Sequence, residues 1–203
     1  MDGDGNALMN CVLWMDMRGR TDLLQEHKGL LNIDGLSAVK VLNWIRLTGG
    51  IPSTSGKDPA AHMLYIRNHH PEVYAKTFKF LNVLDYLNMR LTGTIVATYD
   101  SILTSWVTDN RNPDDIHYAE GLVKSSGIEA DKFPQVVPCT AVLGTLKPSV
   151  AQELGLDPGV KVVAGAIDTT AAAIGACTVE DYHCHLYIGT SSWMTAHVPF
   201  KLT

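Results

Sequence analysis

The sequence predicts an α/β domain in which short strands alternate with helices. The clearest support is the apolar, β-branched run Val160–Ile167, which has the length of a buried strand and precedes an alanine-rich stretch of high helix propensity. A second apolar run, Leu186–Ile188, also has strand character. The composition agrees, because 46% hydrophobic and 18% charged residues in a chain of 203 suit a folded domain with an apolar core.

Charge and composition exclude several classes of partner. The net charge is −5 without a basic run, which argues against nucleic acid. No apolar stretch reaches the roughly 18 residues that a membrane span needs, and the acidic, glycine-rich start does not resemble a signal peptide. We expect a cytoplasmic protein, because its four cysteines lack CxxC spacing and suit free thiols of a reducing compartment.

The first half of the chain begins with turn chemistry at 2–6, followed by an expected strand over Met9–Met15. Gly35–Thr48 is an expected helix, since Leu36, Val39, Leu42 and Ile45 have helical spacing before two glycines. The loop Gly50–Asp58 resembles a phosphate loop, but its glycine spacing is one residue too long and it lacks the hydroxyl that would hold magnesium.

Proline and glycine mark most of the remaining elements. We expect helices over 59–68, 71–77, 81–91, 112–125 and 148–154, and a strand over 141–146. The stretch 94–104 is rich in β-branched residues but has no clear period, and 133–138 is an extended connector. The turn Pro158-Gly159 leads into the strand 160–167.

Trp14, Asp16 and Arg18 form the first candidate site. On a strand their side chains share one face, because side chains alternate. An indole can cover the C–H face of a polyol while charged groups take its hydroxyls. The alternative is a core tryptophan beside a surface ion pair of little energetic value.

Asp168 is the second candidate, because it stands where the strand 160–167 ends and a helix begins. A carboxylate there points towards the region where open α/β domains bind ligands. The alternative is a helix cap without further function.

Gly189, Thr190 and Ser191 follow the second apolar run and could hold phosphate oxygens through hydroxyl and backbone N–H groups. The alternative is an ordinary turn. His183 and His185 are two residues apart on the same expected strand, but further metal ligands are missing, so we predict no metal ligands in this chain.

These residues together resemble the FGGY family of carbohydrate kinases, and the xylulose kinase branch most. The resemblance depends on the order of several blocks along the chain. They are Leu13–Arg18, similar to a Trp-x-Asp-x-Arg segment, Asp85–Leu87, Arg90–Gly93, Leu154–Leu156, Gly165–Asp168 and Gly189–Ser191.

The resemblance implies phosphoryl transfer from ATP to a sugar hydroxyl with magnesium, xylulose or a related pentulose or polyol being the acceptor. Asp168 would accept the hydroxyl proton, which suits a transfer that depends on positioning and charge neutralisation. Trp14, Asp16, Arg18 and Thr169 would contact the sugar, and Gly189, Thr190 and Ser191 the nucleotide phosphates. Thr169 departs from the asparagine that often stands there in xylulose kinases, so the identity of the sugar stays open.

The resemblance also implies an RNase H-like, actin-like ATPase fold, with a mixed sheet and flanking helices, present here incompletely. We expect residues 1–183 to be a partial N-terminal, sugar-binding domain and 184–203 the truncated start of the nucleotide-binding domain. The family's first Asp-x-Gly-Thr loop does not occur in the sequence. We therefore expect no turnover by this chain alone, and homo-oligomerisation through an open sheet edge.

Two alternatives stay open. The chain could be a non-catalytic sugar-binding or interaction module derived from a kinase. It could also be an α/β domain of unrelated function, in which the matching blocks are incidental.

Overall fold

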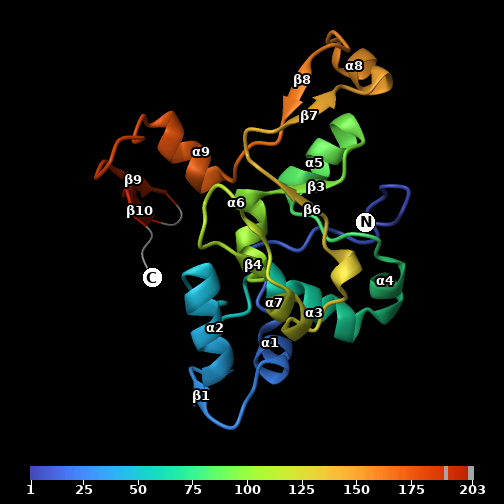
Figure 1. Ribbon diagram of the computed structural model, residues 1–203. Coiled ribbons are helices and arrows are strands. Elements are labelled where there is room, and N and C mark those ends of the chain that lie inside the picture. Colours follow the sequence, from blue (N-terminus) through green and yellow to red (C-terminus); the bar gives the residue numbers. More distant parts are fainter. Residues whose placement is uncertain (190–191, 201–203) are drawn as a thin grey trace.

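Helices contain more residues than strands in the structure, a computed structural model that describes residues 1–189 and 192–200 (Figure 1). The helices are α1 Arg20–Glu26, α2 Ala38–Thr48, α3 Pro59–His69, α4 Pro71–Lys76, α5 Val83–Thr92, α6 Tyr99–Ile102, α7 Glu120–Ser125, α8 Pro148–Leu154 and α9 Asp168–Gly175, with 3-10 turns at Leu103–Ser105 and Ala130–Lys132. None of the described helices is long and apolar enough to cross a membrane.

The strands are short, and in the described residues they form separate two-stranded sheets in place of the expected mixed sheet. They are β1 Asn32–Ile33, β2 Leu36–Ser37, β3 Val96–Thr98, β4 Thr108–Asp109, β5 His117–Tyr118, β6 Gln135–Val137, β7 Val142–Thr145, β8 Lys161–Val163, β9 Cys184–Ile188 and β10 Ser192–Ala196. Pairs β1–β2, β4–β5, β7–β8 and β9–β10 are antiparallel, whereas β3 and β6 are parallel.

Two projections extend from the helical body. Figure 1 shows β7, α8 and β8 as one of them, and α9 with the hairpin β9–β10 as the other. No residue of α9 is buried, so the start of this helix is accessible. The candidate residues of the N-terminal segment belong to the helical body instead, next to α3.

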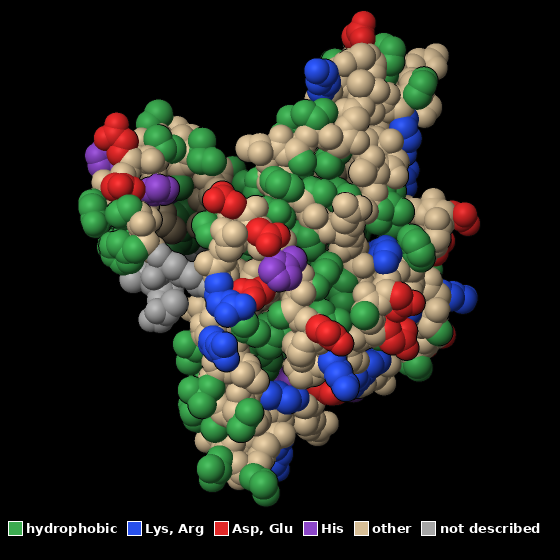
Figure 2. Space-filling model, in the orientation of Figure 1, with side chains coloured by type: hydrophobic (Ala, Val, Ile, Leu, Met, Phe, Trp, Pro, Cys, Tyr) green, Lys and Arg blue, Asp and Glu red, His purple; other side chains and the backbone are tan. Residues whose placement is uncertain are grey.

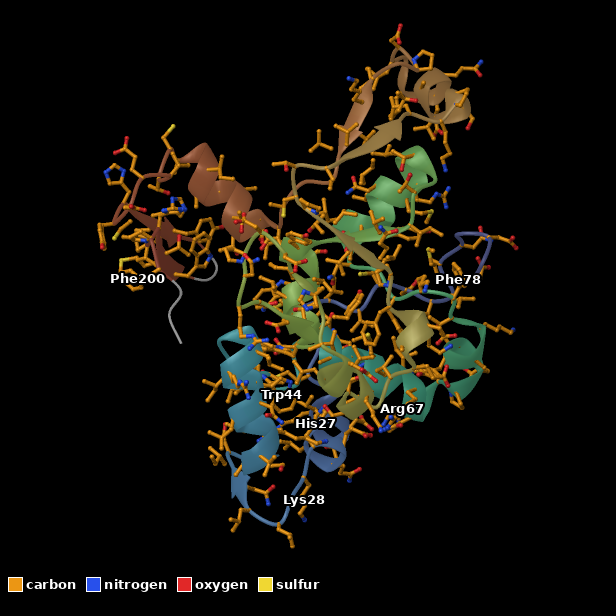
Figure 3. The ribbon with its side chains drawn as sticks, in the orientation of Figure 1. His27, Lys28, Trp44, Arg67, Phe78 and Phe200 are labelled. Carbon is orange, nitrogen blue, oxygen red and sulfur yellow. The ribbon has the colours of Figure 1, made fainter. Side chains whose placement is uncertain are left out.

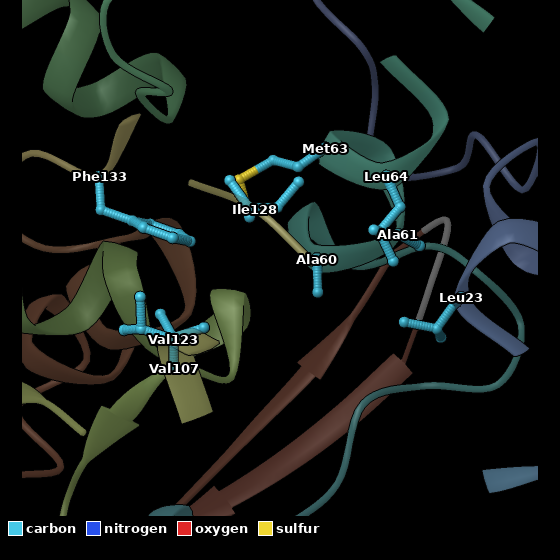
Figure 4. Packing of buried hydrophobic residues seen from close by; sticks show 9 residues of the cluster. All are labelled: Leu23, Ala60, Ala61, Met63, Leu64, Val107, Val123, Ile128 and Phe133. Atoms are coloured by element: carbon cyan, nitrogen blue, oxygen red, sulfur yellow. The ribbon is translucent and has the colours of Figure 1, made fainter. Parts of the chain in front are cut away.

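The larger apolar cluster joins α1, α3 and α7 (Figure 4). Its buried members are Leu23, Ala60, Ala61, Met63, Leu64, Val107, Val123, Ile128 and Phe133. Beside it, the buried Asp22 carboxylate of α1 accepts a hydrogen bond from Asn68 Nδ2 of α3 at 2.7 Å. Because a buried carboxylate is costly without partners, this bond fixes how α1 lies on α3.

A second cluster places α2 against the body through Val41 and Trp44. The His27 ring meets Trp44 edge-on at 5.0 Å (Figure 3), and burial lowers the pKa of His27 to about 4, so it is neutral. The helical spacing of Val39, Leu42 and Ile45 does not mark the buried face of α2: they are 69%, 65% and 40% exposed, and the helix buries Val41 and Trp44 instead.

Three glycine-terminated helices confirm the expected ends. Gly49, Gly93 and Gly155 follow α2, α5 and α8 with φ of 86°, 88° and 67°, the left-handed conformation that glycine adopts without steric cost.

The expected helix over 112–125 is wrong in its first half. Asn112 Oδ1 accepts the Asp114 N–H and forms a turn, and His117–Tyr118 then pairs with β4. The helix therefore begins at Glu120 only.

The expected buried strand 160–167 is also shorter and more exposed. Only Lys161–Val163 pairs, with β7. Pairing stops where Gly165 takes φ of 80° and donates its N–H to the Cys139 carbonyl at 2.8 Å.

Asp85 of α5 connects that helix to the end of β3. Its carboxylate is 1% exposed and accepts hydrogen bonds from Ser101 Oγ at 2.7 Å and from the Thr98 N–H at 3.1 Å. Thr98 and Ser101 also form the capping box of α6. Burial raises the pKa of Asp85 to about 6, although these hydrogen bonds favour the ionised form.

Two further side chains hold the segment that leads into α9. Asn88 of α5 donates from Nδ2 to the Ala164 carbonyl at 2.7 Å, in a buried position. Asp100 of α6 accepts the Ile167 N–H at 3.0 Å. The backbone just before Asp168 is thus tied to both α5 and α6.

Replacing Asp85 with Asn should remove a pH dependence of stability. Between about pH 4 and 6 the native Asp85 carboxyl holds a proton that the unfolded state has released, so its contribution to the free energy of unfolding falls by about 3 kcal/mol as the pH rises through this window. Buried, neutral His27 contributes with the opposite sign over the same range, so the Asp85 contribution is measured as a difference between variants. Denaturant titrations at pH 4.5 and 7 should show that the stability of Asp85→Asn relative to the parent increases with pH, whereas that of Asp114→Asn, an exposed control, stays constant. Equal pH dependence in all three chains would contradict it.

Asn88→Ala should destabilise the chain by about 1–3 kcal/mol, because the buried Ala164 carbonyl loses its donor. Amide hydrogen exchange at Ile167 should accelerate in the variant. Asn43→Ala, on an exposed position of α2, tests for a general helix effect and should leave the Ile167 exchange rate unchanged.

Candidate functional site

Asp168 is the first residue of α9 and its side chain is exposed. The helix N-cap is Ile167, and Asp168 Oδ1 accepts the N–H of its neighbour Thr169 at 2.9 Å. A capping side chain would bond two or three residues further along. The position therefore leaves the carboxylate open to solvent, with backbone N–H groups of the first helical turn nearby.

The segment that carries Trp14, Asp16 and Arg18 is not a strand. The Asp16 N–H bonds to the Leu13 carbonyl at 2.9 Å, and Asp16 Oδ1 accepts the Arg18 N–H at 2.9 Å, so two turns replace the expected extended backbone. Aspartate favours such turns because its side chain competes with strand pairing for backbone donors.

Asp16 and Arg18 form a bidentate pair. Arg18 Nε lies 3.0 and 2.9 Å from the two carboxylate oxygens, and Nη2 lies 2.6 Å from Oδ2. Hydrogen bonds from Arg18 lower the pKa of Asp16 to about 2. The Arg18 side chain is 57% exposed, so its outer edge faces solvent.

Trp14 lies at the surface, 63% exposed, rather than in the core. The Lys57 Nζ sits 5.7 Å from its ring centroid, a cation–π contact to the loop before α3. The alternative of a core tryptophan is therefore excluded, and an indole surface is available to a ligand.

Sequence reasoning missed two residues of α3 at this site. Tyr65 Oη accepts a hydrogen bond from Arg18 Nη1 at 3.2 Å, and His62 Nε2 lies 2.9 Å from the Asp16 carbonyl. Their spacing of three residues on a helix was a usable signal for a shared face, but nothing local pointed to the segment that they contact.

Gly189 follows β9 and is exposed, whereas Thr190 and Ser191 lie outside the described residues. His183 and His185 do not converge: His183 lies 3.5 Å from Glu180, and the His185 ring packs on Trp193 at 5.2 Å. In the described ranges, no three His, Cys, Asp or Glu side chains cluster as metal ligands. The residues described here thus do not build a magnesium site by themselves.

The candidate site has two halves, Trp14–Arg18 beside α3 and Asp168–Thr169 at the start of α9, and the structure leaves them apart. The contacts of Arg18 are with α3, and those of Asp168 and Ile167 are with Thr169 and α6. In Figure 1 α9 stands away from α3. Neither the small cavity beside Trp44 nor the open groove of about 430 Å³ along α1 is lined by a predicted site residue.

The comparisons with known proteins support the family resemblance. A sequence model described as the FGGY family of carbohydrate kinases, N-terminal domain, matches residues 1–175. The chain is 30% identical over 194 residues to a xylulose kinase of Bacillus subtilis and 25% identical over 191 residues to a gluconokinase of Bacillus licheniformis. Both matches cover 94% of this chain, but 35% and 34% of those proteins.

The chain thus spans about a third of the length of the curated relatives that it matches. The crystal structure of a xylulose kinase from Rhodospirillum rubrum superposes with a TM-score of 0.79 at 23% identity, over 93% of this chain and 36% of that one. This likeness shows a shared fold, that of part of an actin-like sugar kinase. By the match over residues 1–175, the chain belongs to the FGGY family of carbohydrate kinases.

Proposed function

We propose that this chain is the sugar-binding part of a kinase that transfers the γ-phosphate of ATP to a hydroxyl of xylulose or a related pentulose or polyol. The observation that carries the proposal is the exposed Asp168 at the start of α9, preceded by a backbone that Asn88 and Asp100 hold. Residues 1–183 form the sugar side in this proposal, and 184–203 begin the nucleotide side.

Asp168 acts as the base in this proposal. One carboxylate oxygen is engaged by the Thr169 N–H, and the other can accept the proton of the attacking hydroxyl. Trp14 covers the C–H face of the sugar, Asp16 and Arg18 take its hydroxyls, and Thr169 lies next to the reacting group. Because the contacts of Arg18 and of Asp168 are separate, catalysis in this proposal requires the two parts of the site to meet around the sugar.

ATP and magnesium are the proposed cofactors of the complete enzyme. Gly189, Thr190 and Ser191 are the proposed phosphate contacts in this chain. Magnesium would neutralise phosphate charge during the transfer. We also place the protein in the cytoplasm, as its cysteine pattern suggests.

A chimera tests the function directly. The segment of the Bacillus subtilis xylulose kinase that aligns with this chain is replaced by it, and xylulose-dependent ADP release is measured. We expect activity, and a fall in kcat of about 10²- to 10⁴-fold in Asp168→Asn, the range that general base catalysis supplies. Asp157→Asn, an exposed control, should keep the activity.

A folded chimera that binds ATP and xylulose but shows no turnover would contradict the kinase assignment. It would favour the second candidate, a sugar-binding module without catalysis. For the chain alone, we expect no ADP release with any pentulose or polyol. Turnover of the isolated chain that Asp168→Ala abolishes would contradict this expectation.

Homo-oligomerisation is the proposed assembly, because α2 exposes the apolar stripe Val39, Leu42 and Ile45. Figure 2 shows hydrophobic side chains gathered over α2 and the adjacent β1. Sedimentation velocity should detect concentration-dependent association that Leu42→Lys reduces and Asn43→Lys, the same charge one residue off the stripe, does not. A monomer at all concentrations would contradict the proposal.

A further inference from the structure

The chain contains two Asp-x-Arg segments with the same local geometry. In Asp109–Arg111, Asp109 Oδ1 accepts the Arg111 N–H at 3.1 Å, Nε lies 3.0 and 3.1 Å from the two oxygens, and Nη2 lies 2.7 Å from Oδ2. Asp16 and Arg18 repeat each of these bonds within 0.2 Å. The pairing therefore forms from the local sequence and is not by itself a sign of a ligand site.

Contacts with α3 distinguish Arg18 from Arg111. Arg18 Nη1 donates to Tyr65 Oη at 3.2 Å, and its Cζ lies 4.7 Å from the centroid of the Tyr65 ring. In the part of the chain that the structure describes, Arg111 bonds to Asp109 alone. Tyr65 thus restrains the Arg18 guanidinium through both its hydroxyl and its ring face.

The backbone of the same segment is held by the same helix face. His62 Nε2 donates to the Asp16 carbonyl at 2.9 Å, since a carbonyl can only accept. Gly19 lies so close to α3 that a Cβ there would collide with the Ala61 carbonyl. Residues 61, 62 and 65 of one helical turn therefore support residues 16–19.

The donor count shows what the restrained guanidinium can still bind. Of its five N–H groups, one on Nε and one on Nη2 face Asp16, and one on Nη1 faces Tyr65. Two remain, one on each terminal nitrogen, and the 57% exposure of the side chain leaves them accessible to a ligand. Donors on two neighbouring guanidinium nitrogens can serve two adjacent oxygens, such as the vicinal hydroxyls of a sugar.

We propose that Tyr65 is a positioning residue, which with His62 aims the two free N–H groups of Arg18 at two adjacent hydroxyl oxygens of the sugar. The proposal rests on the proposed function. The group of the sugar that Arg18 would recognise is a vicinal diol. The residues that orient Arg18 belong to α3 and not to the Asp-x-Arg segment itself.

Nitrogen-15 NMR of the arginine side chains tests the positioning without any ligand. Tyr65→Phe removes the acceptor and keeps the ring. We expect faster rotation and hydrogen exchange of the Arg18 guanidinium in this variant, with the Arg111 signals unchanged as an internal control. Tyr74→Phe, which removes a hydroxyl that accepts a 3.2 Å bond from the Glu129 N–H, should change neither arginine.

Calorimetry with D-xylulose and xylitol tests the recognition. Tyr65→Phe should weaken binding about three- to tenfold, the effect of one hydrogen bond of ordinary net strength, with little change in the unfolding midpoint. A deoxy analogue that lacks one of two adjacent hydroxyls tests whether Arg18, held by Tyr65, contacts that pair of hydroxyls. The parent chain should lose affinity for it, and Tyr65→Phe should lose less, because the lost contact is already weakened.

Separate outcomes overturn separate claims. Unchanged Arg18 signals and unchanged affinity in Tyr65→Phe would overturn the positioning role. Absence of polyol binding in the parent, with altered Arg18 signals in Tyr65→Phe, would overturn the proposed function while supporting the contact. If Tyr65→Phe fails to fold, His62→Gln, which keeps an N–H donor, should retain binding that His62→Leu loses, and equal affinity of the two would overturn the proposal.

Discussion

The hydrogen bonds of α5 are the constraint on which the candidate catalytic residue depends. Asp85 holds the end of β3 and the start of α6, and Asn88 holds the Ala164 carbonyl. Asp100 of α6 then takes the Ile167 N–H. Because three of the partners are buried or half-buried backbone groups that would otherwise be unsatisfied, these bonds fix the segment before Asp168.

The two halves of the candidate site differ in how they are supported. Arg18 is restrained on α3, a helix of the main core, whereas Asp168 opens a helix with no buried residue. A sugar kinase needs both halves around one ligand, and the relatives are about three times as long as this chain. In the proposed function, the part supported on α3 would recognise the sugar and Asp168 would be the reacting group.

The lengths of the strands also depend on how each strand is covered and paired. Parallel strands are stable when both faces are covered, and β3 is fully buried against the helices while its partner β6 is half exposed. The remaining described strands form antiparallel pairs, in which the two strands can be joined by a short turn or by one connecting segment. The helices, whose hydrogen bonds are local, therefore contain more residues than the strands.

The sequence by itself determined what depends on neighbouring residues: the glycine-terminated helices, the acid at the start of α9 and the family. It did not predict that Trp14 to Arg18 would turn rather than extend, or that α2 would bury Trp44 in place of Leu42. The contact of Arg18 with Tyr65 joins residues 47 positions apart. The turn forms from local hydrogen bonds of Asp16, which compete with strand pairing. Only the tertiary structure decided the buried face of α2 and the contact of Arg18 with Tyr65, because both depend on partners that are distant in the chain.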